Sequence, residues 1–345
     1  MSLRTSSRIA LSALEKKRFL DCITRFRKSR VLVVGDFILD QFIWGTVDRI
    51  SPEAPVPVVL VNRESYMPGG ALNVANNIHS LGGKVYPCGV LGRDLQGRML
   101  VKVMRSNGIE TGGVLSDASR PTSLKTRIIA HSQQVVRFDR ENNSEIPAEK
   151  TRKIVQFVRE RIQEADVLVI EDYGKGLIQP EMLKALVRIA RKHKKPVLVD
   201  PKEKHFPFYK GVTLITPNRK EAYGGYLNGA AGAAKPAIEE VGRGLLKKLQ
   251  CDAVLITLGE DGMALFEKSG KITKIPTAAR EVYDVSGAGD TVIAVLALAL
   301  AAGARMPDAS ILANLAAGIV VGKLGTANVT PDELRQAVEA AGRKN

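Results

Sequence analysis

The sequence has little of several features that define other protein classes. Its three cysteines show no Cys-x-x-Cys spacing, so they are expected to be buried thiols rather than disulfides or metal ligands. Its four histidines are dispersed, and aromatic residues make up only 5% of the chain. The longest apolar run, residues 292–302, is too short to cross a bilayer, and no signal peptide opens the chain. These absences predict a cytoplasmic protein with no membrane partner.

Composition and charge otherwise predict a well-folded globular protein. Hydrophobic residues make up 45% and charged residues 25% of 345 residues, enough for one large domain with a small appendage. The formal net charge of +15 suggests nucleic acid as a partner. However, the basic residues are scattered, without interleaved aromatics or a nucleic-acid motif. We therefore expect no nucleic-acid partner, and an anionic small substrate accounts for part of the charge.

Apolar strand patterns alternate with amphipathic helix patterns along the chain. This alternation predicts an α/β fold in which helices cover both faces of a mostly parallel central sheet. Residues 1–29 are expected to form an N-terminal extension with a covering helix, and residues 30–345 the main domain. Two excursions, around residues 40–63 and 121–139, are rich in β-branched residues. The first also has prolines typical of edge strands, and together the two predict a small β lid.

The segment 284–291, Asp-Val-Ser-Gly-Ala-Gly-Asp-Thr, runs directly into the apolar helix-forming residues 292–302. A helix N-terminus presents unpaired N–H groups and the positive end of the dipole, so this turn predicts an anion hole. Asp290 on its rim fits a general base beside a transferring phosphoryl group. The same residues are also compatible with an acid that only favours the helix dipole, after glycines that only turn the chain.

Polar side chains follow several predicted strands, at the sheet edge where ligands bind in open α/β folds. Asp36 follows the first strand and is a candidate for holding substrate hydroxyls, or else a local turn residue. Gly70 and Asn73 open a helix, where the amide can reach a ligand or remain solvated. Three further strands end in polar loops, at residues 171–175, 200–202 and 216–221. The segment 257–262 follows a fourth strand, and its hydroxyl and glycines suit a nucleotide phosphate.

Four motifs together resemble the successive signatures of the ribokinase/PfkB family of carbohydrate kinases. They are Gly69-Gly70-x-x-Asn73, Thr216-Pro-Asn218-x-x-Glu221, Thr257-x-Gly259-x-x-Gly262 and Asp284-x-x-Gly287-Ala288-Gly289-Asp290, in a match over about residues 30–340. Four further runs, at residues 49–57, 133–139, 172–176 and 200–202, resemble the branch that acts on D-glycero-β-D-manno-heptose 7-phosphate. Many members of that branch carry an additional adenylyltransferase domain, which this chain is expected to lack.

The resemblance implies a ribokinase-like fold and a phosphoryl transfer from ATP, with Mg²⁺, to C1 of the heptose phosphate in lipopolysaccharide core biosynthesis. Asp290 would be the catalytic base, and the anion hole would consist of Gly287, Ala288 and Gly289. The residues implied for ATP are Asn218, Glu221, Thr257, Gly259, Gly262 and Asn314, with Glu221 acting indirectly on Mg²⁺.

The resemblance assigns Asp36, Gly70 and Asn73 to the sugar. Charge and placement select four candidates for the 7-phosphate: Lys125, Arg127, Arg137 and Lys175. A homodimer formed through the lid is expected. Three alternatives stay open from the sequence: a related kinase for fructose phosphate, ribose or a nucleoside; a non-catalytic sugar or nucleotide regulator on the same fold; and a nucleic-acid binder.

Overall fold

A nine-stranded sheet forms the centre of the protein, in the order β14-β13-β12-β11-β10-β9-β2-β5-β6. The computed structural model describes residues 9–343 except for residues 132, 228–235, 280, 324 and 326. The strands from β12 to β6 run parallel, and β13 and β14 are antiparallel at one edge. The parallel strands are β2 (Arg30–Gly35), β5 (Lys84–Gly92), β6 (Gly113–Asp117), β9 (Val167–Glu171), β10 (Val197–Asp200), β11 (Leu214–Ile215) and β12 (Ala253–Thr257). The antiparallel edge strands are β13 (Met263–Glu267) and β14 (Ile272–Ile275).

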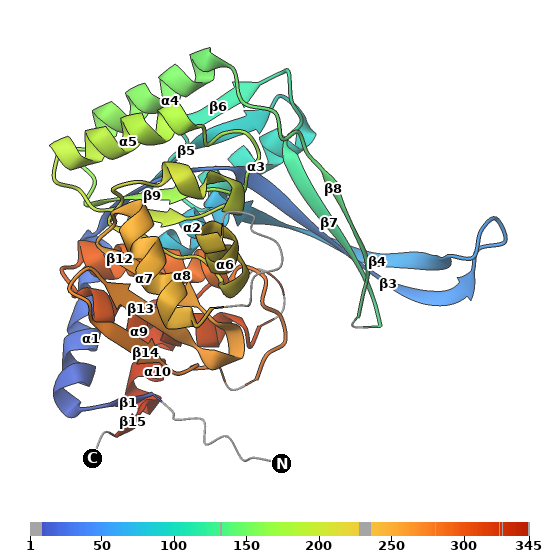
Figure 1. Ribbon diagram of the computed structural model, residues 1–345. Coiled ribbons are helices and arrows are strands. Elements are labelled where there is room, and N and C mark those ends of the chain that lie inside the picture. Colours follow the sequence, from blue (N-terminus) through green and yellow to red (C-terminus); the bar gives the residue numbers. More distant parts are fainter. Residues whose placement is uncertain are drawn as a thin grey trace.

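Helices cover both faces of this sheet (Figure 1), because successive strand residues point to opposite sides. Val31 and Val33 of β2 belong to one core, and Leu32 and Val34 to the other. The first core is completed by α1 (Ala13–Arg25), α2 (Ala71–Ser80), α3 (Leu95–Ser106), α8 (Ala288–Ala301), α9 (Met306–Val320) and α10 (Pro331–Ala340). The second is completed by α4 (Ala148–Arg161), α5 (Pro180–Lys192), α6 (Arg219–Leu227) and α7 (Ile238–Leu249). The predicted ribokinase-like α/β architecture is confirmed.

Helix α8 lies at the middle of the first core. Its residues from Asp290 to Ala299 are all buried, as expected for a helix that is apolar on every side. It contacts α2 and the strands β2, β9 and β10. Its N-terminus is therefore held at the carboxyl edge of the parallel strands.

A second sheet of four strands, in the order β4-β3-β7-β8, extends away from the body (Figure 1). Its strands are β3 (Phe37–Ile50), β4 (Pro57–Gly70), β7 (Ser123–Ala130) and β8 (Gln133–Arg140). These strands run further toward the body than the excursions expected from the sequence. Only Asp36 separates β3 from β2, and β4 runs directly into α2. We refer to these four strands as the lid.

Two expectations about the remaining chain can be compared with the structure. Cys22, Cys88 and Cys251 are buried free thiols, as the apolar runs around them predict. Within the part of the chain that is described, no helix combines the length and the apolar character needed to cross a membrane.

Candidate active site

A cavity of about 250 Å³ lies at the carboxyl edge of the parallel strands. The predicted residues that line it are Asn218, Glu221, Thr257, Gly287, Gly289 and Asp290. Residues that were not selected as site residues also line it, among them Asp172, Tyr173, Asp200 and Lys202. Lys202 is the one basic side chain among the described lining residues. The cavity is thus rich in carboxylates, which is unfavourable for a phosphate unless a cation accompanies it.

The N-terminus of α8 forms one wall of the cavity. Gly287 caps the helix with φ of 78°, a left-handed conformation that favours glycine. The N–H of Ala288 donates to the Val285 carbonyl at 3.2 Å and is not available to a ligand. Among the described residues, by contrast, the N–H groups of Gly289 and Asp290 have no acceptor. Of the predicted anion hole, Gly289 therefore has an available N–H and Ala288 does not, and the N–H of Asp290, which was not predicted to take part, is available beside Gly289.

Asp290 is only 3% exposed and holds two hydrogen bonds. The Asn73 amide donates to its Oδ2 at 2.6 Å, and the Tyr173 hydroxyl donates to its Oδ1 at 2.8 Å. Burial raises the pKa of Asp290 to about 6, against these two donors, and the charge of Asp40 adds to the increase. Asp290 is thus more basic than an exposed aspartate.

The two hydrogen-bond donors to Asp290, Asn73 and Tyr173, were not predicted in this role. Asn73 was expected to reach a ligand, whereas its amide contacts Asp290. Tyr173 was not selected, although it lies in the polar loop 171–175 that the sequence placed at this edge. The presence of a tyrosine within a loop of carboxylates was the only hint in the sequence that Tyr173 belongs to the site. Its contact with Asp290 spans 117 residues, so no local sequence pattern predicts it.

Asp36 makes backbone contacts that the sequence did not predict. Its buried carboxylate accepts three backbone N–H bonds, from Tyr173 at 3.0 Å, Lys175 at 3.1 Å and Leu177 at 3.3 Å. Burial and the charge of Asp172 raise its pKa to about 6. These bonds organise the loop after β9, so Asp36 acts on the site through that loop.

Asp40 is the acid that sequence reasoning missed. It is buried in β3, pairs with Arg127 at 2.5 Å, and its charge raises the pKa of Asp290. It is therefore a nearer candidate than Asp36 for holding substrate hydroxyls. The sequence feature that could have identified Asp40 is its position four residues after Asp36, close to the end of the same strand. Gly70 caps α2 beside these residues, and a side chain there would contact the Asp36 carbonyl.

The Asn-x-x-Glu motif caps α6. Asn218 Oδ1 accepts the Glu221 N–H at 3.0 Å, and the Asn218 N–H donates to Glu221 Oε2 at 3.0 Å. This reciprocal arrangement is a capping box, so the motif already has a structural function. Burial raises the pKa of Glu221, against the lowering effect of its bonds to Asn218 and of the Lys202 charge. The capping box uses one carboxylate oxygen of Glu221, Oε2.

The predicted nucleotide loop divides into open and packed positions. Gly259 has φ of 65° and no atom within 4 Å of the space that a side chain would occupy, so a ligand can approach its backbone. Gly262 has φ of 82°, and a side chain there would contact the Ile275 carbonyl. Asn314 is buried and donates to the Pro276 carbonyl at 2.6 Å. It supports the segment that follows β14 rather than presenting its amide to adenine.

Carboxylate oxygens suited to a hard cation meet beneath α8. Glu171, Asp200 and Asp290 each offer an oxygen within 4.8 Å of the others. Neither oxygen of Glu171 has a hydrogen-bond partner among the described residues, although this side chain is buried. Oxygen donors of this kind are the ligands that Mg²⁺ prefers. The residues present therefore fit a magnesium ion.

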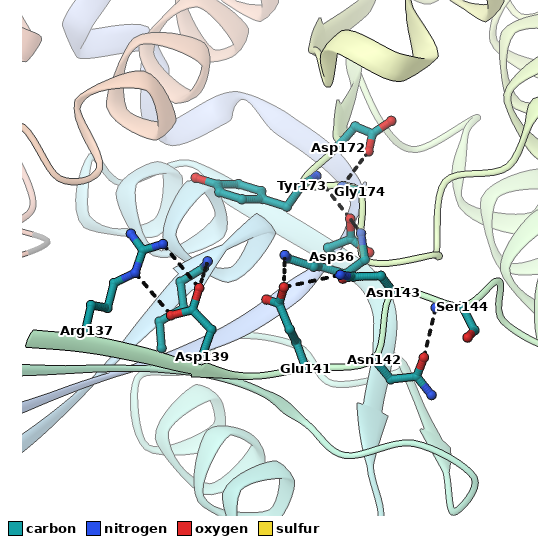
Figure 2. Close-up of polar contacts among 12 residues, drawn as sticks. Asp36, Arg137, Asp139, Glu141, Asn142, Asn143, Ser144, Asp172, Tyr173 and Gly174 are labelled. Atoms are coloured by element: carbon teal, nitrogen blue, oxygen red, sulfur yellow. Dashed lines mark hydrogen bonds and ion pairs between the residues drawn. The ribbon is translucent and has the colours of Figure 1, made fainter.

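All four predicted phosphate-binding cations form ion pairs. Lys125 contacts Asp139 at 3.2 Å, and Lys175 contacts Glu141 at 2.6 Å. Arg137 also contacts Asp139, at 3.1 Å (Figure 2). Arg127 contacts Asp40, as described above. A substrate phosphate must therefore share these cations with lid carboxylates. Two of the four cations, Lys125 and Arg137, therefore converge on one carboxylate.

Three kinds of comparison place the chain among known proteins. The model of the pfkB family carbohydrate kinases matches residues 28–333. The bifunctional protein HldE of Geobacter metallireducens is 46% identical over 321 residues, 93% of this chain and 65% of its own length. The bifunctional protein HldE of Helicobacter pylori is 44% identical over 309 residues, 88% and 65% of the two chains. The chain thus spans slightly less than two thirds of these relatives.

Solved structures agree in fold at lower identity. Phosphofructokinase-2 from Escherichia coli, in complex with substrates and products, superposes with a TM-score of 0.74 at 18% identity over 91% of this chain and 99% of its own. Arabidopsis thaliana ribokinase, complexed with ribose and ATP, gives 0.69 at 18% identity over the same shares. These likenesses concern the fold alone.

Proposed function

Because the chain belongs to the pfkB family of carbohydrate kinases, we propose that it transfers the γ-phosphoryl group of ATP to C1 of D-glycero-β-D-manno-heptose 7-phosphate. The product would be the 1,7-bisphosphate, made in the cytoplasm as a precursor of lipopolysaccharide core. The observation that carries the reaction type is Asp290, a buried carboxylate directly beside available N–H groups at a helix N-terminus. The heptose motifs and the 46% identity to a protein named HldE support the acceptor.

Asp290 takes the proton from the C1 hydroxyl as that oxygen attacks the γ-phosphorus. Asn73 and Tyr173 fix the orientation of its carboxylate, since each donates to one of its oxygens. The N–H groups of Gly289 and Asp290 stabilise charge on the transferring group. Asp40 is placed to hold a neighbouring sugar hydroxyl, and the lid excludes water, which would compete as an acceptor.

The donor side uses the loops after β10, β11 and β12. Gly259 lets the nucleotide approach the backbone, and Lys202 offers a positive charge to its phosphates. Glu171, Asp200 and Glu221 are the groups that would hold Mg²⁺, directly or through water. When bound, Mg²⁺ supplies charge neutralisation to the phosphates.

Glu221→Gln should raise the Mg²⁺ concentration needed for half-maximal rate by roughly tenfold, in the range typical of groups that support a metal ligand. Glutamine keeps the capping box, because it is also favourable at this helix position, so α6 should remain folded. The measurement is a Mg²⁺ titration of initial rate at saturating ATP. An unchanged titration would leave Glu221 with the structural cap as its only function.

The acceptor is tested by ADP release with a panel of sugars. Heptose 7-phosphate should give the highest kcat/KM, ahead of fructose 6-phosphate, ribose and adenosine. Fructose 6-phosphate carries the charge but is one carbon shorter, so its anomeric centre should be misplaced relative to Asp290. A better rate with one of the other acceptors would leave the family assignment intact and reject the heptose.

We also propose a homodimer formed through the lid. Large apolar side chains are exposed there, including Leu60 at 64% and Phe138 at 51%, and exposed apolar patches of this kind favour association.

Leu60→Asp should raise the dimer dissociation constant at least about a hundredfold, because each buried leucine contributes about 1.5–3 kcal/mol and a two-fold interface uses it twice. Leu14→Asp, at an exposed leucine of α1, is the matched control. Sedimentation velocity would measure both, and an unaffected dimer in Leu60→Asp would place the interface elsewhere.

A further inference from the structure

Asp172 accepts hydrogen bonds from two residues that have no part in the mechanism described above. Its side chain is fully buried at the end of β9. Its Oδ2 accepts from the Tyr209 hydroxyl and from His205 Nδ1, each at 2.6 Å, and both groups must donate because a carboxylate is an acceptor. Its Oδ1 accepts the Gly174 N–H at 2.8 Å (Figure 2). Three donors therefore hold one carboxylate, directly before Tyr173 in the chain.

The Tyr209 hydroxyl makes a second hydrogen bond, on the donor side of the site. Its oxygen accepts the Lys202 N–H at 2.9 Å, and Lys202 lines the cavity. Burial and the Asp172 charge raise the pKa of Tyr209 well above its usual value, so the hydroxyl keeps the proton that it donates. The two loops also lie close together, since a Cβ at Gly174 would be 3.2 Å from Lys202 Cγ. One hydroxyl thus joins the loop after β9 to the loop after β10.

Packing, rather than these hydrogen bonds, holds the Tyr209 ring. Tyr209 is 0% exposed and contacts Phe206 edge-on, with the ring centroids 5.9 Å apart. Phe206 is also fully buried and belongs to the 3₁₀ helix Glu203–Phe208, which contacts α5 and α6. A phenylalanine would keep these ring contacts. The hydroxyl can therefore be removed without removing the packing that folds this segment.

We propose that Tyr209 and His205 are positioning residues for phosphoryl transfer. Through Asp172 they hold the loop whose Tyr173 hydroxyl orients the catalytic base. Through the backbone of Lys202, the Tyr209 hydroxyl also holds the cation that faces the nucleotide phosphates. Neither of the two is among the described residues that line the cavity, so both act from outside it. The inference rests on the proposed kinase function and adds a link between its acceptor and donor sides.

Asp36 offers a competing explanation for the order of the loop after β9. Its carboxylate accepts three backbone N–H groups of residues 173–177, as described above. If those bonds alone fixed the loop, the Tyr209 hydroxyl would only satisfy the buried Asp172 carboxylate. Its removal would then lower the melting temperature without changing the kinetics of the folded enzyme. The two explanations therefore differ in kcat and in the KM for ATP.

The main variant is Tyr209→Phe, assayed by ADP release at saturating sugar. Its kcat should fall about tenfold because the loop with Tyr173 shifts, and its KM for ATP should rise about fivefold because Lys202 loses its backbone tether. Tyr86→Phe is the matched control, since Tyr86 is also buried and its hydroxyl donates to Glu164 at 3.2 Å, near the start of β5. The control should keep both constants at the wild-type level.

Double-mutant cycles identify the path of each effect. In a Tyr173→Phe background, Tyr209→Phe should lower kcat no further, and in a Lys202→Met background it should raise the KM for ATP no further. Additivity in one background would reject that arm of the link, and additivity in both would overturn the proposal. A Tyr209→Phe enzyme with wild-type kcat and KM would overturn it in favour of Asp36.

His205→Ala and His205→Asn test the second donor to Asp172. Alanine removes the bond and should lower kcat, whereas the asparagine amide can replace the Nδ1 donor and should restore it. The KM for ATP should stay at the wild-type level in both, because the Lys202 N–H bonds Tyr209 rather than His205. Equal kcat values in the two variants would reject His205 as a positioning residue.

ATP binding by calorimetry, without sugar, separates this inference from the proposed function. Tyr209→Phe should bind ATP more weakly than Tyr86→Phe does, whatever the acceptor. A wild type that does not phosphorylate the heptose would reject the proposed acceptor, and the cycles would then use the best sugar of the panel. Unchanged ATP binding in Tyr209→Phe would reject the link to Lys202 even if the heptose is the substrate.

Discussion

Asp290→Asn should remove most turnover while leaving the fold and ATP binding nearly unchanged. General base catalysis of this kind contributes about 10²–10⁴-fold, and an amide cannot accept the proton. Asparagine fits the local hydrogen bonds: its oxygen can accept from Asn73, and its NH₂ group can donate to the Tyr173 hydroxyl, which rotates to accept. The loss should therefore appear in kcat, with little change in the KM for ATP.

The matched control for this variant is Asp252→Asn. Asp252 is exposed and precedes β12, at the opposite edge of the sheet from the cavity. Initial rates of ADP release, nucleotide binding by calorimetry and melting temperature should be measured for both variants. Turnover in Asp290→Asn equal to that of the control would reject Asp290 as the base, whatever the identity of the acceptor.

The elements that position Asp290 were predictable because their sequence signals are local. The apolar run 30–35 and its repeats specify buried parallel strands, and the glycines before residues 292–302 specify the start of a buried helix. A turn followed by such a helix places Asp290 at an anion hole in any α/β fold of this kind. The local sequence pattern was therefore sufficient to predict these strands and the start of this helix.

The contacts of the site were not predictable in the same way. Asp36 and Asp40 both follow β2 and carry the same charge, and only the folded chain shows that the first binds backbone N–H groups of residues 173–177. The Tyr173 hydroxyl and the Glu171 carboxylate acquire their roles from side chains more than 25 residues away in sequence. Pairings of this range depend on the tertiary packing of β9, β10 and α8, which no local pattern encodes.

The ion pairs of the lid were likewise not predictable from the sequence. The sequence predicted cations for a substrate phosphate, but the carboxylate partners of those in the lid depend on strand register, for example the pairing of Lys125 with Asp139 across β7 and β8. A cross-strand pair of opposite charge contributes about 0.2–1 kcal/mol, and a charge-assisted bond to phosphate contributes about 1.5–3 kcal/mol. A phosphate can therefore compete with Asp139 for Lys125 and Arg137. The carboxylate keeps the cations in place when no substrate is bound.

Because a bond to phosphate is stronger than the ion pair it replaces, the lid cations predict a strong preference for a phosphorylated sugar. Heptose 7-phosphate should be a far better acceptor than the same heptose without its phosphate. Losing two or more bonds of about 1.5–3 kcal/mol each predicts at least about a hundredfold lower kcat/KM. The ratio of kcat/KM between the phosphorylated and the unphosphorylated heptose should fall by about tenfold or more in Lys125→Met or Arg137→Met, because each variant removes one such bond.

Lys274→Met is the matched control, since Lys274 is an ion-paired lysine of β14 outside the lid. Steady-state ADP release with both sugars, at saturating MgATP, gives the ratio for each protein. The two lid variants should lose rate with heptose 7-phosphate while their slow rate with unphosphorylated heptose stays at the wild-type level, because only the phosphate contact is removed. Equal losses with both sugars would mean that Lys125 and Arg137 support the lid rather than the phosphate. A wild type that does not distinguish the two sugars would show that the 7-phosphate is not recognised at all, and the cations of the lid would then serve only the carboxylates with which they already pair.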